Sequence, residues 1–518
     1  MHLAYGFIGL FVLASSAASA DGLTVPHTFS NGQVADATEV NGNFKALADE
    51  SNENDLRIGS LEGGKFTTPF LSLSNNDKGS YSTLFGYEAG FNLAVASEKN
   101  SAFGYRALSF NTTGNANTAT GFSALYFNTT GSDNTANGNQ ALQSNSTGEG
   151  NTANGSQALV LNTEGRNNTA NGRQALYQNN TGDFNTAGGY KALYSNTTGS
   201  FNSANGYAAL YTNTTGMHNT ATGNQALYSN ITGEFNTANG MSALLFNTSG
   251  SYNTANGVEA LYFNTEGLNN TASGRQALYS NETGGFNSAE GYKALYSNQT
   301  GSFNAANGYA ALNFNSTGSN NTATGNQALY ENRTGGGNTA IGALADVMSA
   351  NLSNATAIGY NAKVSRSNKI RLGNTAVTII EGQVPLTTTS DIRLKEYIQT
   401  TRLGLDFIND LNPVQYHRIN NKEADLELGI IAQELKAVLE KHHASDSGMI
   451  QQVDDGYMSV RYNDLIAPLI KSVQELSAEN LMLKEASDTK IAKLEAELAA
   501  QKSQMAELKA LVIASTSH

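Results

Sequence analysis

The amino-acid sequence predicts a mainly β chain, with a repetitive β-solenoid fibre followed by an α+β region that ends in a coiled coil. A glycine recurs every 17 residues from Gly104 to Gly359. Only 39% of the residues are hydrophobic and 14% are charged, while 52 are glycine, a composition that favours a turn-rich repetitive fold over disorder. Beyond Ser390 the composition changes from Asn, Gly, Thr and Ala to Leu, Glu, Lys and Ile.

The repeating unit approximates NTAxGxxALxxNxTGxx, as in NTANGNQAL at residues 134–142. Two glycines per unit disfavour a helix, because each costs about 1 kcal/mol relative to alanine. Each unit has two short strand-compatible stretches, separated by Asn and Gly, which tolerate the left-handed backbone of tight turns. The apolar positions are one alanine and an Ala-Leu pair, such as Ala136, Ala141 and Leu142. This small core cannot offset an ordering entropy of roughly 1–2 kcal/mol per residue, so we expect stacking along the axis and against other chains.

In style, these repeats resemble the head repeats of trimeric bacterial surface adhesins, which are shorter than 17 residues. The resemblance implies a left-handed β-roll in which three chains pack side by side, and therefore a homotrimer. The many Asn-x-Thr/Ser sequences, such as residues 111–113, are interpreted as Asn and Thr recurring at turns rather than as glycosylation sites.

Residues 1–20 are predicted to be a secretory signal peptide, with a short apolar stretch and small residues at the cleavage site. We therefore expect a secreted protein at the bacterial cell surface; the alternative is an uncleaved anchor, since the leading segment has no Lys or Arg. No other stretch is apolar enough to predict an integral membrane domain. The net charge of −13 argues against a nucleic-acid partner. The chain has no cysteine and no phosphate loop, dinucleotide fingerprint or metal cluster, so we expect no cofactor and no metal.

The C-terminal segment predicts a long amphipathic helix that begins near Tyr462. No Gly or Pro interrupts residues 469–513, and apolar residues follow a heptad-like spacing with one stutter near Ser487. This pattern predicts a coiled coil, and both a dimer and a trimer remain open.

Three separated sequence blocks follow the array: SDIRLK at 390–395, GIIAQE at 429–434 and LIAPLIKSVQEL at 465–476. Together they resemble the intramolecular chaperone domain of endosialidase-type tailspikes, the peptidase S74 family, over about residues 390–485. The resemblance implies a domain that trimerises, assists folding of the fibre ahead of it and then cuts itself off. It also implies that Ser390 is the nucleophile, that Lys395 is its base, and that the scissile bond is Thr389–Ser390.

This chemistry is consistent with the residue types. A serine hydroxyl is a weak nucleophile until a base removes its proton, and a lysine acts as that base only when neutral, a state that burial favours. Cleavage could therefore report correct assembly. The alternative is that Ser390 or Asp391 caps a helix while Arg393 and Lys395 form a solvated face. Asp391 and Arg393 either orient the dyad or pair with each other, and His417 either assists catalysis or is structural.

The predicted segments are 1–20, signal peptide; 21–65, an N-terminal segment with a short coiled coil or a single amphipathic helix; 66–362, the 17-residue β-roll repeat array; 363–389, a β-rich linker with strands at 368–373 and 377–380; 390–476, the S74-like intramolecular chaperone and autoprotease domain; and 477–513, the coiled coil.

The predicted function is that of a secreted homotrimeric surface fibre, adhesin-like, whose chaperone domain acts as a single-turnover, self-cleaving serine endopeptidase. One alternative is a structural fibre with a permanent trimerisation domain that never cuts. Another is a phage-like receptor-binding fibre that recognises glycans, against which the predicted signal peptide argues. The residues identify no ligand of the array, whether a surface glycan or another host molecule.

Overall fold

The computed structural model describes residues 73–76, 81–94, 96–377, 379–384, 386–417, 419, 426–452 and 456–516. The predicted signal peptide at 1–20 and the predicted N-terminal segment at 21–65 lie outside the described residues. The chain divides into two units, Met1–Leu73 and Ser74–His518, and the second contains nearly all of the described structure.

The strands and helices are β1 (Leu73–Asn76), β2 (Ser82–Phe85), β3 (Ser101–Phe103), β4 (Thr118–Thr120), β5 (Thr135–Asn137), β6 (Thr152–Asn154), β7 (Thr169–Asn171), β8 (Thr186–Gly188), β9 (Ser203–Asn205), β10 (Thr220–Thr222), β11 (Thr237–Asn239), β12 (Thr254–Asn256), β13 (Thr271–Ser273), β14 (Ser288–Glu290), β15 (Ala305–Asn307), β16 (Thr322–Thr324), β17 (Thr339–Ile341), β18 (Asp346–Val347), β19 (Thr356–Ile358), β20 (Lys363–Val364), β21 (Ile370–Leu372), the 3₁₀ helix η1 (Ile392–Leu394), α3 (Leu405–Asn409), β22 (Pro413–Tyr416), β23 (Glu427–Ile430), α4 (Ala432–Lys441), β24 (Ile450–Gln452), β25 (Met458–Val460), η2 (Tyr462–Leu465) and α5 (Ile466–Ser515).

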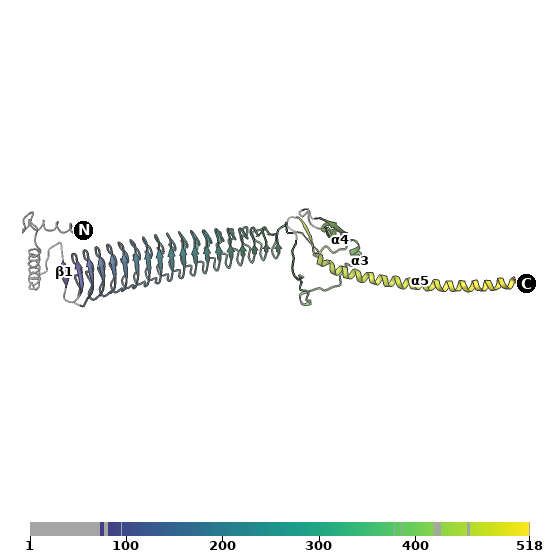
Figure 1. The fold of residues 1–518 in the computed structure, drawn as a ribbon, viewed down its shortest axis with the longest axis horizontal. Helices are drawn as coiled ribbons and strands as arrows, with labels where there is room; N and C mark the ends of the chain where they lie inside the picture. The colour runs from purple at the N-terminus through teal and green to yellow at the C-terminus, as the bar shows by residue number, and fades with distance from the viewer. Residues whose placement is uncertain are drawn as a thin grey trace, which may run out of the picture. The chain divides into compact units, whose positions relative to one another are not determined.

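The repeat array is a parallel β-solenoid, which confirms the predicted fold class. Each 17-residue unit makes one coil and contributes one three-residue strand to a 19-stranded sheet, and successive coils stack on one another (Figure 1). The register is constant: Thr135 pairs with Thr152 and Ala136 with Ala153, one unit further along. Two strand-compatible stretches per unit were expected, but only one forms a strand of this sheet. The rest of the coil is turns that also hydrogen-bond to the next coil, as where Leu142 N donates to Ala158 O at 2.9 Å.

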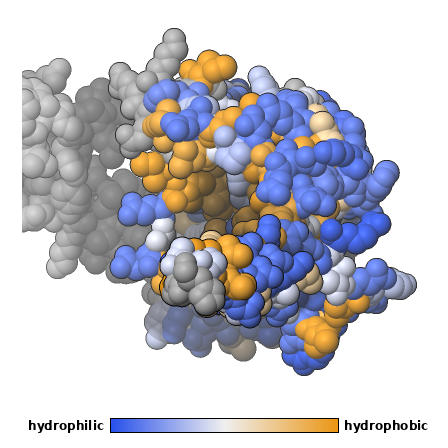
Figure 2. Space-filling model, turned by 90° about the vertical axis from the view of Figure 1, so that its right-hand side faces the viewer, coloured by the Kyte–Doolittle hydropathy of each residue, from blue (hydrophilic) through white to orange (hydrophobic). Residues whose placement is uncertain are grey.

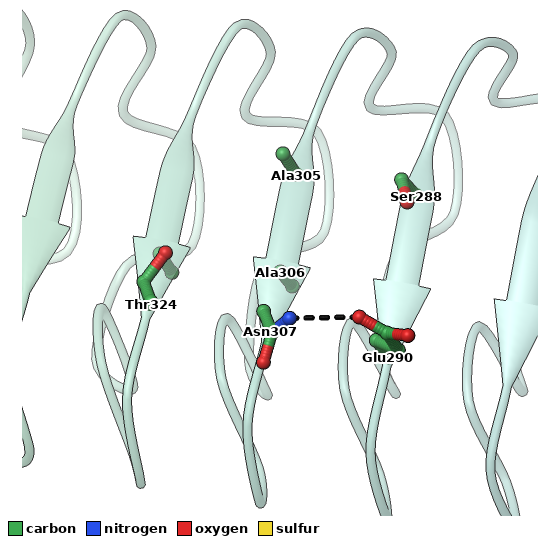
Figure 3. Close-up of a pocket in the computed structure, with 7 residues that line it drawn as sticks. Ser288, Glu290, Ala305, Ala306, Asn307 and Thr324 are labelled. Atoms are coloured by element: carbon green, nitrogen blue, oxygen red, sulfur yellow. Dashed lines mark hydrogen bonds between the residues drawn. The ribbon is translucent and has the colours of Figure 1, made fainter.

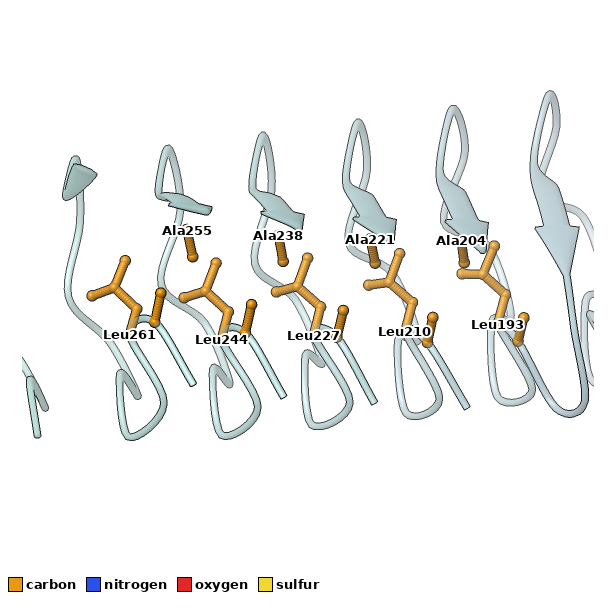
Figure 4. Packing of buried hydrophobic residues seen from close by; sticks show 14 of the residues in the cluster. Leu193, Ala204, Leu210, Ala221, Leu227, Ala238, Leu244, Ala255 and Leu261 are labelled. Carbon is orange, nitrogen blue, oxygen red and sulfur yellow. The ribbon is translucent and has the colours of Figure 1, made fainter. Parts of the chain in front are cut away.

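The apolar core runs along the inside of the solenoid as ladders of identical side chains. Each coil places one strand alanine and one Ala-Leu pair inside, and in the middle of the array these side chains are fully buried (Figure 4). The buried leucines have left-handed backbone, as for Leu142 with φ 50°, where a side chain costs roughly 1–2 kcal/mol. The stacked coils maintain this conformation at every unit, so it is a property of the stack and not of one turn.

Buried asparagines complete the core. In each coil two Asn side chains have no exposed surface, as for Asn134 and Asn145. The Asn145 amide donates to Asn128 Oδ1 of the preceding coil at 2.6 Å and to Gly148 O at 3.0 Å. Sequence reasoning counted only three small apolar residues per unit and therefore undercounted the core. Many asparagines of the Asn-x-Thr/Ser sequences, such as Asn111, are among these buried ladder residues, which leaves no room for a glycan on them in the folded array. Others, such as Asn167 and Asn269, are exposed.

Glycine is required where successive coils approach closely. Gly138 has φ 143°, and a Cβ there would lie 2.6 Å from Gly155 O of the next coil. Each glycine of this series meets the next in the same way, so the 17-residue glycine period marks coil-to-coil contact in addition to the turn.

The outer face of the sheet is polar along most of the array, and exposed large apolar side chains such as Phe103 and Ile341 lie on it only toward the two ends. Side chains at the first and third strand positions point outward, and the shallow surface around β14 to β16 is lined by Ser288, Glu290, Asn307 and Thr324 (Figure 3). Asn307 Nδ2 donates to Glu290 Oε2 of the neighbouring coil at 2.7 Å. The hydroxyl and amide groups of this face are therefore available to solvent along the array.

The sheet continues beyond the last regular repeat. β21 pairs with β19 in parallel, with Thr356 opposite Ile370. The predicted strand at 377–380 is wrong for its described residues, which have no regular structure. Val377, Ile379 and Ile380 are exposed, and β-branched composition alone does not form a strand without a neighbour to pair with.

The C-terminal α+β domain has a small separate core. Phe407 of α3 and Leu435 and Leu439 of α4 are buried there. The full cluster is Leu403, Phe407, Leu435, Leu439, Ala444, Met449 and Leu465.

The last element, α5, is a single helix of 50 residues. Its apolar side chains, such as Leu483, Leu494 and Leu508, are more than half exposed in the single chain. Viewed from the end that carries this helix, apolar side chains lie at the surface among polar ones (Figure 2). An isolated helix with an exposed apolar stripe obtains most of its stability from packing against partners.

Candidate functional site

The run SDIRLK forms a tight turn around η1. Asp391 is the N-cap, and its Oδ1 accepts the N–H of Arg393 at 2.9 Å. The backbone N–H groups of Leu394 and Lys395 then donate to Asp391 O and Ile392 O, both at 3.1 Å. Asp, Ser and Thr favour such caps because a short side-chain oxygen reaches a backbone donor two residues on. The turn reverses the chain, so that the fifth residue after Ser390 returns to it.

Ser390 and Lys395 come together across this turn. Lys395 Nζ donates to Ser390 Oγ at 2.7 Å. A neutral amine at the same separation is positioned to accept the hydroxyl proton, since a general base must lie within about 2.6–3.2 Å of the group it deprotonates. The arrangement can therefore generate a serine alkoxide next to the Thr389–Ser390 peptide bond.

Asp391 and Arg393 pair with each other. Arg393 Nε and a terminal guanidinium nitrogen donate to the two carboxylate oxygens of Asp391 at 3.0 and 2.8 Å. The Arg393 side chain, together with its backbone N–H, lowers the pKa of Asp391. The sequence left open whether Asp391 and Arg393 orient the dyad or pair with each other, and in the structure they pair with each other. This pair joins two residues of the turn that brings Lys395 to Ser390.

His417 is not one of the residues that form the Ser390 turn. It directly follows β22 (Pro413–Tyr416), which pairs in antiparallel fashion with β23. Its position gives it no part in forming the turn, because η1 and its caps come entirely from residues 390–395.

The site is open to solvent in the single chain. Ser390 and Lys395 are exposed, as is Thr389. The apolar side chains around them are exposed as well: Ile392 by 71%, Leu394 by 72% and Tyr397 by 92%. Such a concentration of exposed apolar residues is typical of a surface that another chain covers.

The second sequence block contacts Tyr462, which lies three residues before the third block. Gly429 packs against the phenol oxygen of Tyr462, and a Cβ added at Gly429 would lie 2.5 Å from that oxygen. The same oxygen, Tyr462 Oη, accepts the N–H of Ile430 at 3.0 Å. Gly429 is therefore needed for close packing rather than for a turn.

The third block also anchors α3 to α5. Glu475 Oε2 accepts the N–H of Leu405 at 2.6 Å, and Glu475 Oε1 pairs with Lys471 Nζ at 3.0 Å. The Leu405 N–H and the Lys471 ammonium hold the pKa of Glu475 below its usual value. Sequence reasoning named this block only as a motif, and it gave no signal for the Glu475 contact, which joins residues 70 positions apart.

Comparison with known families places this domain. Residues 390–443 match the chaperone of endosialidase family, Peptidase_S74. The match begins at Ser390 and covers the turn, α3, β22, β23 and α4, so it ends before the third sequence block. The similarity of this segment to the endosialidase chaperone family implies a role in trimerising and folding the fibre that precedes it. No curated protein matches the chain.

The described residues offer neither a metal centre nor a membrane-spanning helix. They contain no group of three or more His, Cys, Asp or Glu side chains that could hold a metal ion. Within the same residues, no helix combines the length and the apolar character needed to cross a membrane.

Proposed function

We propose that this chain is a secreted, homotrimeric surface fibre whose endosialidase chaperone domain drives trimerisation and folding and then cuts the chain once, between Thr389 and Ser390. The mature product is the β-solenoid fibre, which acts in adhesion at the bacterial surface. The observation that carries the proposal is the 2.7 Å contact between Lys395 Nζ and Ser390 Oγ at the first residue of the family match.

The cleavage step follows from this contact. Neutral Lys395 accepts the hydroxyl proton of Ser390, and Oγ attacks the carbonyl carbon of Thr389. The carbon–nitrogen bond to Ser390 breaks, Lys395 returns its proton to the departing nitrogen, and the Thr389 acyl group remains on Oγ as an ester. Water then hydrolyses the ester, which leaves a carboxylate at Thr389 and a free amine at Ser390.

Assembly is proposed to switch this reaction on. In the single chain the pair is exposed, and Lys395 Nζ is the donor of its hydrogen bond to Ser390 Oγ, not the acceptor that a general base must be. Partner chains that cover Ile392, Leu394 and Tyr397 would exclude water and favour the neutral amine. Cutting would then follow correct trimerisation and not precede it.

The trimer itself is proposed to form through α5. Its exposed apolar residues continue over many turns, as for Ile491, Leu494 and Leu498, each about half exposed. Three such helices would bury one another's stripes as a coiled coil. The predicted signal peptide supports secretion, because it would place the fibre outside the cell.

The test is the intact mass and N-terminal sequence of the chain expressed without residues 1–20. Wild-type protein and a Thr388→Ala control, which removes a neighbouring hydroxyl, should each give a fragment that begins at Ser390. Ser390→Ala should remain whole. A wild-type chain that stays whole as a trimer would replace this proposal with the non-cleaving structural fibre, in which the solvated turn is only a capped surface feature.

A further inference from the structure

Stacked aromatic rings recur at one position of the solenoid coil in three sets, the first of which has an additional ring, Tyr87, stacked on Tyr105. A tyrosine followed by a basic residue lies on one coil, a second ring lies on the next coil, and Asn-Gln lies on the coil after that. The three sets are Tyr105–Arg106, Phe122 and Asn139; Tyr190–Lys191, Tyr207 and Asn224; and Tyr292–Lys293, Tyr309 and Asn326.

Backbone hydrogen bonds place the members of each set on successive coils. In the second set, Ala208 N donates to Tyr190 O and Gln225 N donates to Tyr207 O, both at 2.9 Å. The corresponding bonds of the third set are both 2.8 Å long. The Asn224 side chain is exposed on the coil next to Tyr207.

The second ring of each pair has one covered and one open face. Tyr207 stacks on Tyr190 and Tyr309 on Tyr292, with ring centroids 5.4 Å apart in both pairs. On the other side, the next coil brings an asparagine instead of a ring. Tyr207 is 53% exposed and Tyr309 is 51% exposed, so an aromatic face beside an amide is open to a ligand.

A lysine lies beside two of these sets. Lys191 Nζ lies between two rings, 5.4 Å from the centroid of Tyr190 and 5.2 Å from that of Tyr194. Lys293 Nζ lies in the same way 5.4 Å from the centroid of Tyr292 and 5.0 Å from that of Tyr296. Among the described residues, neither lysine is in an ion pair with a carboxylate. The first set differs, because Arg106 is paired with Glu88 at 2.6 Å. On a chain with a net charge of −13, the two lysines are therefore cations at equivalent places of the coil that remain available to an anionic ligand.

We propose that the Lys191 and Lys293 sets are two equivalent binding sites for the sugar units of a carboxylate-bearing polysaccharide. The sugar carboxylate pairs with the lysine ammonium, an apolar sugar face lies on the open ring of Tyr207 or Tyr309, and hydroxyls bond to the neighbouring asparagine amide. The Arg106 set takes no acidic sugar, because Glu88 already neutralises its cation. This inference rests on the proposed role of the array as a surface fibre.

The spacing of the two sites favours a linear polymer over a protein partner. Residues 190 and 292 are six units apart, which is about 29 Å at the usual separation of about 4.8 Å between parallel strands. One extended chain can occupy both sites, and the second contact is then intramolecular, which raises the overall affinity without new contacts.

The test is binding of the chain without residues 1–20 to immobilised polygalacturonate, a linear polymer of uronic acid, with neutral dextran as the second surface. Lys191→Met/Lys293→Met and Tyr207→Ala/Tyr309→Ala should each weaken binding about tenfold or more, because both sites are lost together. Arg166→Met, which removes an exposed array cation away from the ring pairs, should bind like wild type. Dextran should not retain any of these proteins.

Three results would overturn the inference: no binding of wild type to polygalacturonate, equal weakening by Arg166→Met, or loss of the trimer in the tyrosine variant, which would make the rings an interface between chains. Fragment masses from the same preparations separate this inference from self-cleavage. A chain that cuts at Ser390 but does not bind contradicts only the sugar sites, and a chain that binds without cutting contradicts only the peptidase.

Discussion

Lys395 Nζ lies 2.7 Å from Ser390 Oγ, across a turn whose cap is Asp391. The contact depends on the local sequence alone, since every hydrogen bond of the turn lies within residues 390–395. A preformed but solvated pair is consistent with a reaction that waits for assembly, because the geometry is present before the environment that makes lysine a base.

Lys395→Arg is expected to abolish cutting while leaving the trimer intact. The guanidinium keeps its charge at all accessible pH values and cannot accept the serine proton. Fragment analysis by mass and oligomer analysis by light scattering check this. A variant that still cuts at Ser390 would show that another group is the base.

The rate of self-cleavage should rise with pH in the wild-type chain. Only neutral lysine accepts the Ser390 proton, and the neutral fraction increases as protons are removed from the solvent. The rate would be followed by fragment formation after refolding at a series of pH values. A rate that stays constant or falls as pH rises contradicts a lysine base.

Neighbouring glycines of β8 and its following turn offer a matched pair for the solenoid. Gly189→Ala should locally destabilise the coils, by about 1–3 kcal/mol, because Gly189 has φ 122° and its Cβ would lie 2.6 Å from Gly206 O. Gly188→Ala should be nearly neutral, since its Cβ would meet only the Asn205 side chain at 3.3 Å. Hydrogen exchange of the backbone around both positions measures the difference, and equal exchange rates in the two variants would contradict the close-contact explanation.

The buried asparagine ladder should be more costly to interrupt than the exposed one. Asn219 donates to Gly233 O at 2.8 Å and accepts from Asn236 N at 3.0 Å. Gly233 O keeps a second donor, Asn230, but Asn219→Ala leaves the buried Asn236 N–H without its acceptor and costs about 1–3 kcal/mol. Asn239 is exposed and bonds sideways to Asn256, and Asn239→Ala should change the free energy of unfolding by about 0.5 kcal/mol or less. Thermal unfolding of both variants compares them, and a larger loss for Asn239→Ala would refute the assignment of the core.

Asp346 gives the solenoid end a predictable pH dependence. Burial raises the pKa of Asp346, and Lys363, at 3.4 Å from Oδ2, opposes this only in part. Because the folded state then holds the proton more tightly than the unfolded chain, this group's contribution to stability is full below its unfolded value near 3.8 and is lost as pH rises through the folded pKa. Asp346→Asn is neutral at every pH and resembles the protonated carboxyl, so the stability curves of the two proteins should coincide at low pH and separate as the pH rises, with wild type losing stability relative to the variant. Parallel curves would mean that Asp346 does not titrate differently on folding.

The sequence predicted the solenoid and its period because each unit repeats the same apolar and glycine positions. The assignment of the asparagines to turns was only partly right: Asn167 and Asn269 have the left-handed backbone of turns, but Asn134 and Asn145 lie in the core, and Leu142 has the left-handed backbone instead. Propensity cannot reveal this exchange, since the hydrogen bonds that stabilise it join residues of different coils. In the C-terminal domain, the Ser390 turn followed from local sequence, but the Glu475–Leu405 contact did not, because it depends on the tertiary packing of α3 against α5.

Native mass spectrometry of the chain without residues 1–20 measures assembly and cutting together, in wild type and in Leu494→Asp/Leu498→Asp, with Lys493→Ala as a control on the polar side of α5. Wild type and the control should yield trimers whose chains are cut before Ser390. The aspartate variant should be monomeric and whole, because charges on the apolar stripe of α5 prevent the helices from packing. A monomer that is nevertheless cut at Ser390, or a wild-type trimer that is never cut, would contradict the link between assembly and self-cleavage.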